Sequence, residues 1–216
     1  MENVYLIVGL GNPGREYANT RHNVGFMAVE GLAGRWRASW KTEKKFQSRV
    51  ARVDQDTHQV GRGVPAEPRR CLLCEPQTYM NLSGEAVGAM MNFYRLTPER
   101  LLVVIDDADL PFGEIRMRAD GSSGGHHGLE SIEAHLGTRK YPRLRIGIGR
   151  EPGAAREITG YVLGAFRRAD AELLDKVLAR ACDQIECWLN EGIGKAMSRY
   201  NGKIVLDEEK KENSKQ

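Results

Sequence analysis

Residues 3–26 read NVYLIVGLGNPGREYANTRHNVGF, and the expected architecture is built outward from them. It opens with an apolar run at 4–8, rich in β-branched residues, which predicts a strand buried on both faces. A glycine-rich turn with Asn12 follows, and residues 24–36 then carry apolar side chains at the mixed three and four spacing of an amphipathic helix. The strand therefore delivers Asn12 to its carboxyl end, and the helix begins close to His22. In α/β sheets this edge is where ligands bind.

One interpretation of the turn is a dinucleotide site. Gly9, Gly11 and Gly14 match the pattern G-x-G-x-x-G that follows the first strand of a dinucleotide-binding unit. However, Pro13 removes a backbone donor where a pyrophosphate needs one, and no helical pattern starts directly after Gly14. No second strand ends in an acidic residue at the usual distance, because Glu30 lies inside the helical pattern. The sequence therefore disfavours nicotinamide or flavin binding.

A second interpretation is that the turn positions Asn12 while His22 supplies acid–base chemistry. An imidazole with an ordinary pKa near ~6.5 can take up or release a proton at neutral pH. A lone histidine is nevertheless more often a capping or core residue. The stretch by itself leaves both roles of His22 open.

Composition is that of an ordinary globular protein. The 216 residues suit one domain, and the 41% apolar and 28% charged residues lie in the usual range. No apolar run approaches the length that spans a bilayer, and no signal segment follows Met1, so we expect a cytoplasmic protein away from membranes. We expect residues 1–203 to form the domain and the charged residues 204–216 to be a disordered tail.

Basic residues are concentrated between positions 114 and 150, although the net charge of the chain is only +3. This segment holds seven Lys and Arg residues against four Asp and Glu residues. Such an excess fits a phosphate-bearing partner, but a solvated surface of mixed charge would give the same pattern.

The four cysteines do not predict a metal site. Cys71 and Cys74 form CxxC, but they lie in a strand-like run, where residues three apart point to opposite faces. Cys182 and Cys187 have no metal-ligand spacing that we recognise. Structural thiols in a reducing compartment are the favoured interpretation.

The rest of the chain alternates strands and helices, which predicts a single α/β domain with a central mixed β-sheet flanked by helices. A polar stretch with Gly and Pro at 54–70 predicts a long hairpin connection. The further expected strands are 46–53, 71–74, 101–105, 114–118 and 144–148, and the further expected helices are 85–94, 126–136 and 167–190.

Polar residues gather at the ends of these elements. A His and an Asp at strand ends are a standard device for general-base catalysis, because the carboxylate fixes the imidazole tautomer and the free nitrogen takes a proton. No Ser or Cys stands in a G-x-S-x-G turn, so an activated water is the expected attacker. Side-chain amides, or backbone donors at 125–128, could bind an oxyanion. Besides His22, the residues so placed are Asn12, Asn81, Asp106, His126 and His127.

Five blocks of sequence carry a resemblance to a known family. They are LIVGLGNPGREYANTRHNVG at 6–25, TYMNLSGEAV at 78–87, DDADLPFGEIRMR at 106–118, GSSGGHHGLESI at 121–132 and YPRLRIGIGR at 141–150. Together they closely resemble the bacterial-type peptidyl-tRNA hydrolase family. The resemblance implies an enzyme that cleaves the ester joining a peptide to the 3′ end of tRNA, recycling tRNA from aborted translation. It also implies a monomeric α/β fold with a mixed sheet, acting without a metal or cofactor.

The family motifs assign roles to residues of this chain. By resemblance, His22 of T-R-H-N is the catalytic base and Asp106 its orienting carboxylate. Asn12 of G-N-P-G and Asn81 of M-N-L-S-G match active-site amides, and Asn81 is expected to position the substrate carbonyl or the attacking water.

Other motif residues are expected to bind the substrate. The resemblance places Tyr17 and Met80 in the peptide groove. It places Arg118 and Arg145 in a clamp for the 5′-phosphate of tRNA, for which the two-pronged guanidinium is well suited.

One position departs from the family pattern G-G-H-N-G. Here the segment after Gly125 reads His126-His127-Gly128, so His127 replaces an asparagine that contacts the peptide or the terminal adenosine. Histidine lacks the paired donor and acceptor of the amide. We therefore expect activity to be retained with altered substrate affinity, with His126 and His127 both binding substrate.

Two other functions remain to be weighed. A non-catalytic RNA-binding protein could use the same fold, but the complete set of His, Asp and Asn residues argues against it. An esterase for small esters would not need basic residues such as Arg118 and Arg145 beside the site.

Overall fold

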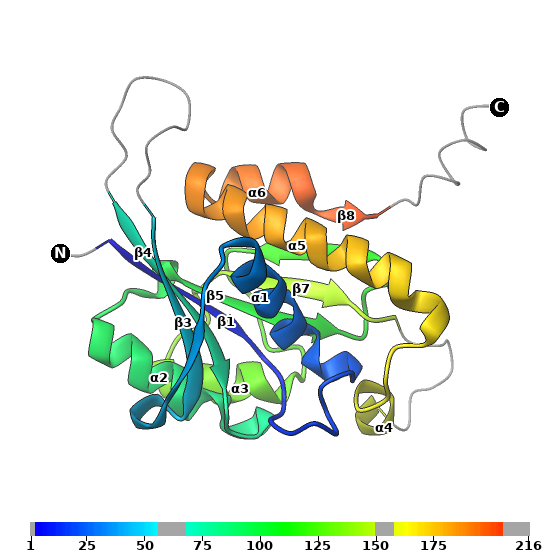
Figure 1. Cartoon of the computed structure of the whole chain (residues 1–216), viewed down its shortest axis with the longest axis horizontal. Coiled ribbons are helices and arrows are strands. Elements are labelled where there is room, and N and C mark those ends of the chain that lie inside the picture. The colour runs from blue at the N-terminus through cyan, green and yellow to red at the C-terminus, as the bar shows by residue number, and fades with distance from the viewer. Residues whose placement is uncertain (1–2, 56–67, 150–157, 205–216) are drawn as a thin grey trace.

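The computed structural model describes residues 3–55, 68–149 and 158–204, and for Ile158 and Thr159 it describes the backbone alone. Among these residues the chain forms one mixed sheet of eight strands in the order β2-β3-β4-β1-β5-β7-β6-β8 (Figure 1). The strands are β1 (Val4–Gly9), β2 (Trp40–Glu43), β3 (Ser48–Gln55), β4 (Arg69–Pro76), β5 (Leu101–Asp107), β6 (Glu114–Arg118), β7 (Arg143–Gly147) and β8 (Gly202–Lys203).

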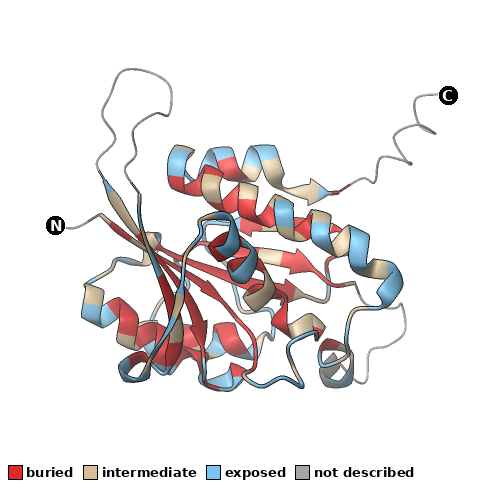
Figure 2. Cartoon of the chain, in the orientation of Figure 1, coloured by how far each residue is buried: buried red, intermediate tan, exposed pale blue. Residues whose placement is uncertain are grey.

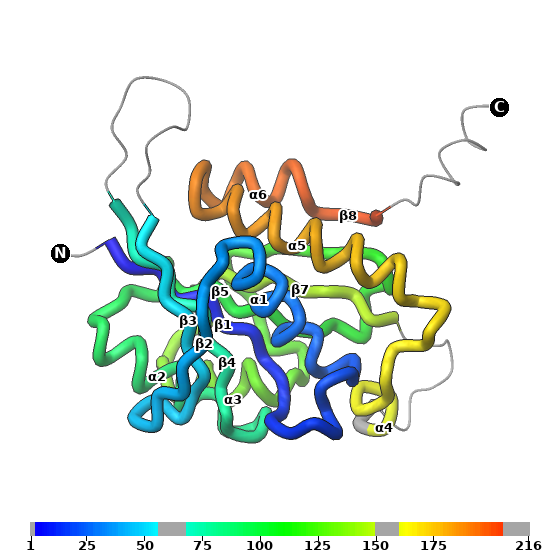
Figure 3. The backbone as a smooth tube through the Cα atoms, in the orientation of Figure 1, coloured from blue at the N-terminus to red at the C-terminus, as the bar shows by residue number. Residues whose placement is uncertain are grey.

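Parallel strands form the middle of the sheet, so their carboxyl ends meet at one edge. β1 pairs in parallel with β4 and with β5, and β5 pairs in parallel with β7. The β2–β3, β3–β4, β6–β7 and β6–β8 pairs are antiparallel. Figure 3 traces this path, with the N-terminal strand β1 inside the sheet. The predicted α/β domain with a mixed sheet is therefore confirmed.

Helices cover both faces of the sheet and enclose two cores. One face packs against α1 (Val24–Arg35), α5 (Ala171–Glu191) and α6 (Ile193–Tyr200), and the other against α2 (Ser83–Tyr94) and α3 (His127–Leu136). Successive side chains of β1 point to opposite faces of the sheet and so enter different cores. Ile7 lies in the first core and Leu6 in the second. Figure 2 shows the buried residues concentrated in the central strands and on the inner sides of the helices.

The cysteines follow the same alternation. Cys71 lies in the core under α1 and Cys74 in the core under α2, so the two thiols are on opposite faces of the sheet. Burial raises the pKa of Cys71 to about 11 and that of Cys74 to about 12, so both are protonated thiols at neutral pH. All four cysteines are free and buried.

Several boundaries differ from the sequence-based expectation. Asp106 lies within β5 rather than after it, because the pairing with β7 continues to Asp107. The long C-terminal helix starts at Ala171, because the residues Arg168–Asp170 form a separate 3₁₀ turn. β2 and α6 were not predicted, since β2 is a short edge strand without apolar alternation and α6 buries only Ala196.

The structure describes only part of the predicted hairpin connection and of the predicted C-terminal tail. β3 runs to Gln55 and β4 starts at Arg69, so the connection is shorter than 54–70, and residues 56–67 lie outside the described part. Ile204 still belongs to the folded body, since its N–H donates to the Gly113 carbonyl at 2.7 Å. The predicted tail beyond it, 205–216, lies outside the described residues. No helix in the described ranges is long and apolar enough to cross a membrane.

Candidate active site

His22 lies on a short 3₁₀ turn, Arg21–Asn23, that leads into α1 at the carboxyl edge of the sheet. The helix can approach this edge because two glycines face each other. A Cβ on Gly9 would lie 2.2 Å from the carbonyl oxygen of Gly25, and a Cβ on Gly25 would lie 2.4 Å from that of Val104. The start of α1 therefore rests directly on the backbone of β1 and β5, and this contact sets the depth of His22.

Asp106, at the end of β5, accepts hydrogen bonds from two histidines. His22 Nδ1 lies 2.8 Å and His126 Nε2 lies 3.1 Å from the same oxygen, Asp106 Oδ1. The carboxylate is only 4% exposed, and burial alone would raise its pKa. The hydrogen bonds from His126 and His22 outweigh burial and hold the pKa of Asp106 far below its usual range. Asp106 is thus ionised and can only accept, so both facing ring nitrogens donate.

The position of His126 fixes its tautomer. This residue is the N-cap of α3, and its Nδ1 accepts from the backbone N–H groups of Gly128 at 3.2 Å and Leu129 at 3.4 Å. Its ring proton is therefore on Nε2, which donates to Asp106. When the His22 ring is neutral, its proton lies on Nδ1, which faces Asp106, and its Nε2 carries the lone pair.

His22, Asp106 and His126 are also the one cluster in the described chain with the spacing of metal ligands, since their ligand atoms lie within 4.8 Å of one another. To bind a metal through Nε2, His126 would have to move its proton to Nδ1. That proton would then point at the N–H groups of Gly128 and Leu129. The donor set therefore suits a hydrogen-bonded network better than a metal ion.

Asn12 is a buried link between the glycine-rich turn and the start of α2. Its backbone N–H donates to Asn23 Oδ1 at 2.9 Å, and Asn23 Nδ2 donates back to the Asn12 carbonyl at 2.9 Å. Its own Oδ1 accepts from the Met80 N–H at 2.8 Å. The amide of Asn12 therefore holds the loop that carries Met80 and Asn81.

A cavity of about 770 Å³ opens over these residues. It is large enough for the end of a peptide or a nucleoside, and polar and apolar residues both line it. It is lined by Asn12, His22, Tyr79, Met80, Asn81, Asp106, Asp107, Ala108, Asp109, Gly124, Gly125, His126, His127, Arg145, Val162 and Leu163.

Comparison with known proteins agrees with this geometry. Residues 6–212 match the family model described as peptidyl-tRNA hydrolase. A peptidyl-tRNA hydrolase of Synechococcus sp. (strain JA-3-3Ab) is 49% identical over 91% of this chain and 82% of its own length, and one of Synechocystis sp. (strain ATCC 27184 / PCC 6803 / Kazusa) is 44% identical over 93% and 97%. The crystal structure of peptidyl-tRNA hydrolase from Acinetobacter baumannii has a TM-score of 0.81 and 38% identity, covering 94% of this chain and 97% of its own.

The chain belongs to the peptidyl-tRNA hydrolase family. Its activity is accordingly the hydrolysis of peptidyl-tRNA. A family member needs a site for the peptide ester and a surface for the RNA, and the remaining predicted residues divide between these two parts.

Two predicted residues of this hydrolase lie outside the cavity lining. Tyr17 is half-buried on the turn before His22, where its carbonyl accepts from Thr20 Oγ1 at 2.8 Å. Arg118 is exposed on β6. Because β6 pairs with β7 through Arg118 and Arg143, the diagonal neighbour of Arg118 on the same face is Arg145.

Arg145 is partly engaged within the protein. Its Nη1 lies 3.1 Å from Asp107 Oδ2, and its Nη2 donates to the Ser122 carbonyl at 2.7 Å. The guanidinium has five N–H donors, so these two contacts leave capacity for a phosphate.

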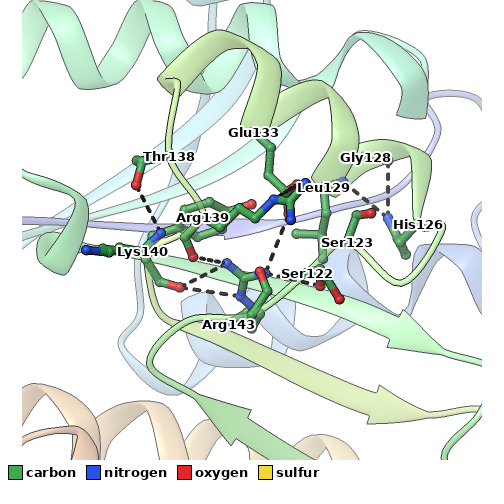
Figure 4. A network of polar contacts seen from close by, with 12 residues as sticks. Ser122, Ser123, His126, Gly128, Leu129, Glu133, Thr138, Arg139, Lys140 and Arg143 are labelled. Atoms are coloured by element: carbon green, nitrogen blue, oxygen red, sulfur yellow. Dashed lines mark hydrogen bonds and ion pairs between the residues drawn. The ribbon is translucent and has the colours of Figure 1, made fainter.

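A second arginine of β7, Arg143, organises the loop before α3 and was not predicted from the sequence. It is fully buried, and its guanidinium donates to the carbonyls of Gly121 at 2.6 Å and Arg139 at 2.7 Å (Figure 4). Together with Arg145 it holds the segment that leads to His126. Alternation of arginine with leucine on a strand normally indicates a solvated face, so this burial could not be predicted from the local pattern.

His127 is the residue that departs from the family pattern. Its side chain is 72% exposed at the cavity rim, and Nδ1 lies 3.1 Å from Glu130 Oε2 one turn along α3. Its neighbour His126 points inward to Asp106. The two adjacent histidines therefore have different environments.

Proposed function

We propose that His22 is the general base of this peptidyl-tRNA hydrolase and that Asp106 orients it. The observation that carries the proposal is the 2.8 Å contact between His22 Nδ1 and an ionised Asp106 on the floor of the cavity. The unprotonated Nε2 of His22 would take a proton from a water as that water attacks the ester carbonyl. Asp106 would stabilise the imidazolium that forms.

The second histidine has a supporting role in this proposal. His126 donates to the same Asp106 oxygen, and it is kept in that tautomer by the backbone of α3. It would hold Asp106 ionised and in place, so that the carboxylate does not turn away from His22 during the reaction.

The oxyanion of the tetrahedral intermediate would be bound by the Asn81 amide, with Asn12 fixing the loop that presents it. Backbone donors at the start of α3 are less available than the sequence indicated. The Gly128 N–H donates to His126, and the Gly125 N–H donates to Ser123 Oγ.

The substrate would lie across the cavity and out onto β6 and β7. Met80, His126 and His127 would border the peptide or the terminal nucleoside, with Tyr17 near the outer end of that groove. Arg118 and Arg145 would grip a phosphate of the RNA from neighbouring strands. We propose that residues 1–203 do this as a cytoplasmic monomer without metal or cofactor.

The test is release of an N-blocked amino acid from tRNA by the purified protein. His22→Ala should lower the rate by a factor on the order of 10²–10⁴ or more, because the general base is lost. The matched control is His135→Ala, since His135 is an exposed histidine of α3 whose Nδ1 bonds the Ser131 carbonyl. Near-normal turnover of His22→Ala would refute the assignment of the base. Absence of turnover in the wild type, with tRNA still bound, would favour a binding protein and point to His127 as the cause.

A further inference from the structure

One wall of the cavity comes from a segment far along the chain. Val162, the last residue of α4 (Ile158–Val162), and Leu163 after it both line the cavity. Val162 is buried, whereas Leu163 is 37% exposed. This apolar wall contributes no polar group to the site, so its effect on the reaction depends on where it is held.

The wall is attached to the turn that carries His22. Thr20 and Ala165 form an isolated antiparallel bridge, and the Arg21 N–H donates to the Gly164 carbonyl at 3.0 Å. Thr20 and Arg21 directly precede His22 in the chain, and Gly164 and Ala165 directly follow Leu163.

The side chain of Arg21 makes the remaining connection. Its guanidinium lies over the Tyr161 ring at 4.5 Å from the centroid and near the Phe166 ring at 5.7 Å, and its Nη1 lies 3.5 Å from the Tyr161 carbonyl oxygen. A Cβ on Gly164 would come within 2.9 Å of Arg21 Nη1, so the chain passes close around the guanidinium. Two aromatic faces and a carbonyl suit the planar, multi-donor guanidinium better than an ammonium.

We infer that Arg21 is a positioning residue for the reaction, which fixes the wall of Val162 and Leu163 beside His22. Arg21 does not line the cavity, so it acts through the wall. The inference rests on the proposed role of His22. Because Arg21 and His22 share one three-residue turn, the turn that aims the base at Asp106 also places the wall. A fixed apolar wall limits the positions open to the ester and to water, and small misplacements of reacting groups are costly.

The experiment compares Arg21→Met, Arg21→Lys and a matched control, Arg15→Met, on N-blocked aminoacyl-tRNA. Arg15 is an exposed arginine of the preceding turn. We expect Arg21→Met to lower kcat about tenfold with a smaller change in KM, since the loss is one of positioning rather than of substrate contact. Arg21→Lys should recover part of kcat through its remaining cation–π contact, and Arg15→Met should match the wild type. Thermal unfolding of each variant checks that it is folded at the assay temperature.

A double-mutant cycle with Tyr161→Leu identifies the route of the effect. If Arg21 acts through the wall, the double variant should lose little more kcat than the worse single variant. Additive losses, or a loss confined to KM that disappears at raised salt, would show direct contact between Arg21 and RNA and overturn the inference. An unchanged kcat in folded Arg21→Met would also overturn it. Failure of the proposed base appears separately, as turnover retained by His22→Ala.

Discussion

The candidate site has two parts, the Asp106 centre (His22, Asp106 and His126) and the arginine pair (Arg118 of β6 and Arg145 of β7). They differ in how far their contacts are already formed in the protein without substrate. At the centre, a buried carboxylate already accepts from two histidines whose tautomers are fixed. In the pair, Arg118 is exposed, and Arg145 is held by Asp107 and by a loop carbonyl.

This difference matches the role proposed for each part. A hydrolytic centre must present groups to a transition state without reorganising, so its order is set by folding. A phosphate contact needs only charge at the right place and tolerates water and movement. We therefore expect substitutions in the centre to act on kcat and substitutions in the arginine pair to act on KM and its salt dependence.

The largest effect should come from Asp106→Asn. The amide is isosteric but neutral. Its Oδ1 could still accept from both histidines, which contact the same oxygen of Asp106, but it carries no charge to stabilise an imidazolium on His22. We expect kcat to fall by a factor on the order of 10³–10⁴, as when the carboxylate of such a pair is replaced by an amide. Asp107→Asn is the comparison, because Asp107 contacts Arg145 and neither histidine, and it should act mainly on KM. Equal losses of kcat in both variants would remove the distinction between the two parts.

Asn12→Ala should have the next largest effect. It leaves the Met80 N–H buried without its acceptor, which costs about 1–3 kcal/mol of stability, and it frees the loop that presents Asn81. Asn12→Asp keeps that acceptor and removes the amide donor. If Asn12 serves only to hold the loop, Asn12→Asp should retain much of the kcat that Asn12→Ala loses. Single-turnover rates and thermal unfolding distinguish the two cases.

Replacing both arginines, Arg118→Gln with Arg145→Gln, should raise KM for full-length tRNA substrates about tenfold or more. The slope of log KM against log salt should also fall, because both charged contacts to that phosphate are lost. Hydrolysis of a short aminoacyl-nucleotide should hardly change. Arg116→Gln is the matched control, since Arg116 lies on the same face of β6 and is paired with Glu114. An equal effect in the control would mean that only the overall charge matters.

The smallest effect should come from His127→Asn, which restores the residue of the family pattern. His127 is at the exposed rim and contacts Glu130 rather than the histidines of the centre. We expect KM to change a few-fold with kcat nearly constant. A large rise in kcat would instead mean that the natural protein is held nearly inactive by this histidine.

The sequence predicted which residues lie at the carboxyl edge of the sheet better than it predicted which of their side chains contact one another. Asn12 and Asp106 could be placed because strand ends are set by apolar runs and glycine turns. The contact of His126 with Asp106 could not, since it depends on which way an N-cap side chain turns, and its neighbour His127 turns outward. Short amphipathic pieces such as α6 were missed because they are stabilised by packing against the rest of the fold rather than by their own pattern.

Arg21 and Arg143 show that the role of a residue cannot be inferred from its type and its neighbouring motifs alone. Both are basic residues beside functional motifs, which favours a role in phosphate binding when only the sequence is considered. In the fold, Arg143 is buried among backbone carbonyls and Arg21 is stacked on Tyr161. Their partners lie far away in sequence or are backbone atoms, which no local pattern encodes.

The close contact of Gly25 with the sheet has a consequence for engineering a more heat-stable variant. Replacing helical glycines by alanine is a common way to gain stability. In α1, alanine at Gly34 would meet open space and at Gly31 only the Cys182 sulfur at 3.7 Å, so both positions accept this change. At Gly25 the same change would push the helix off the backbone of β5 and move His22 away from Asp106. Within one helix, then, we expect a routine stabilising substitution to be harmless at two positions and to disturb the candidate site at the third.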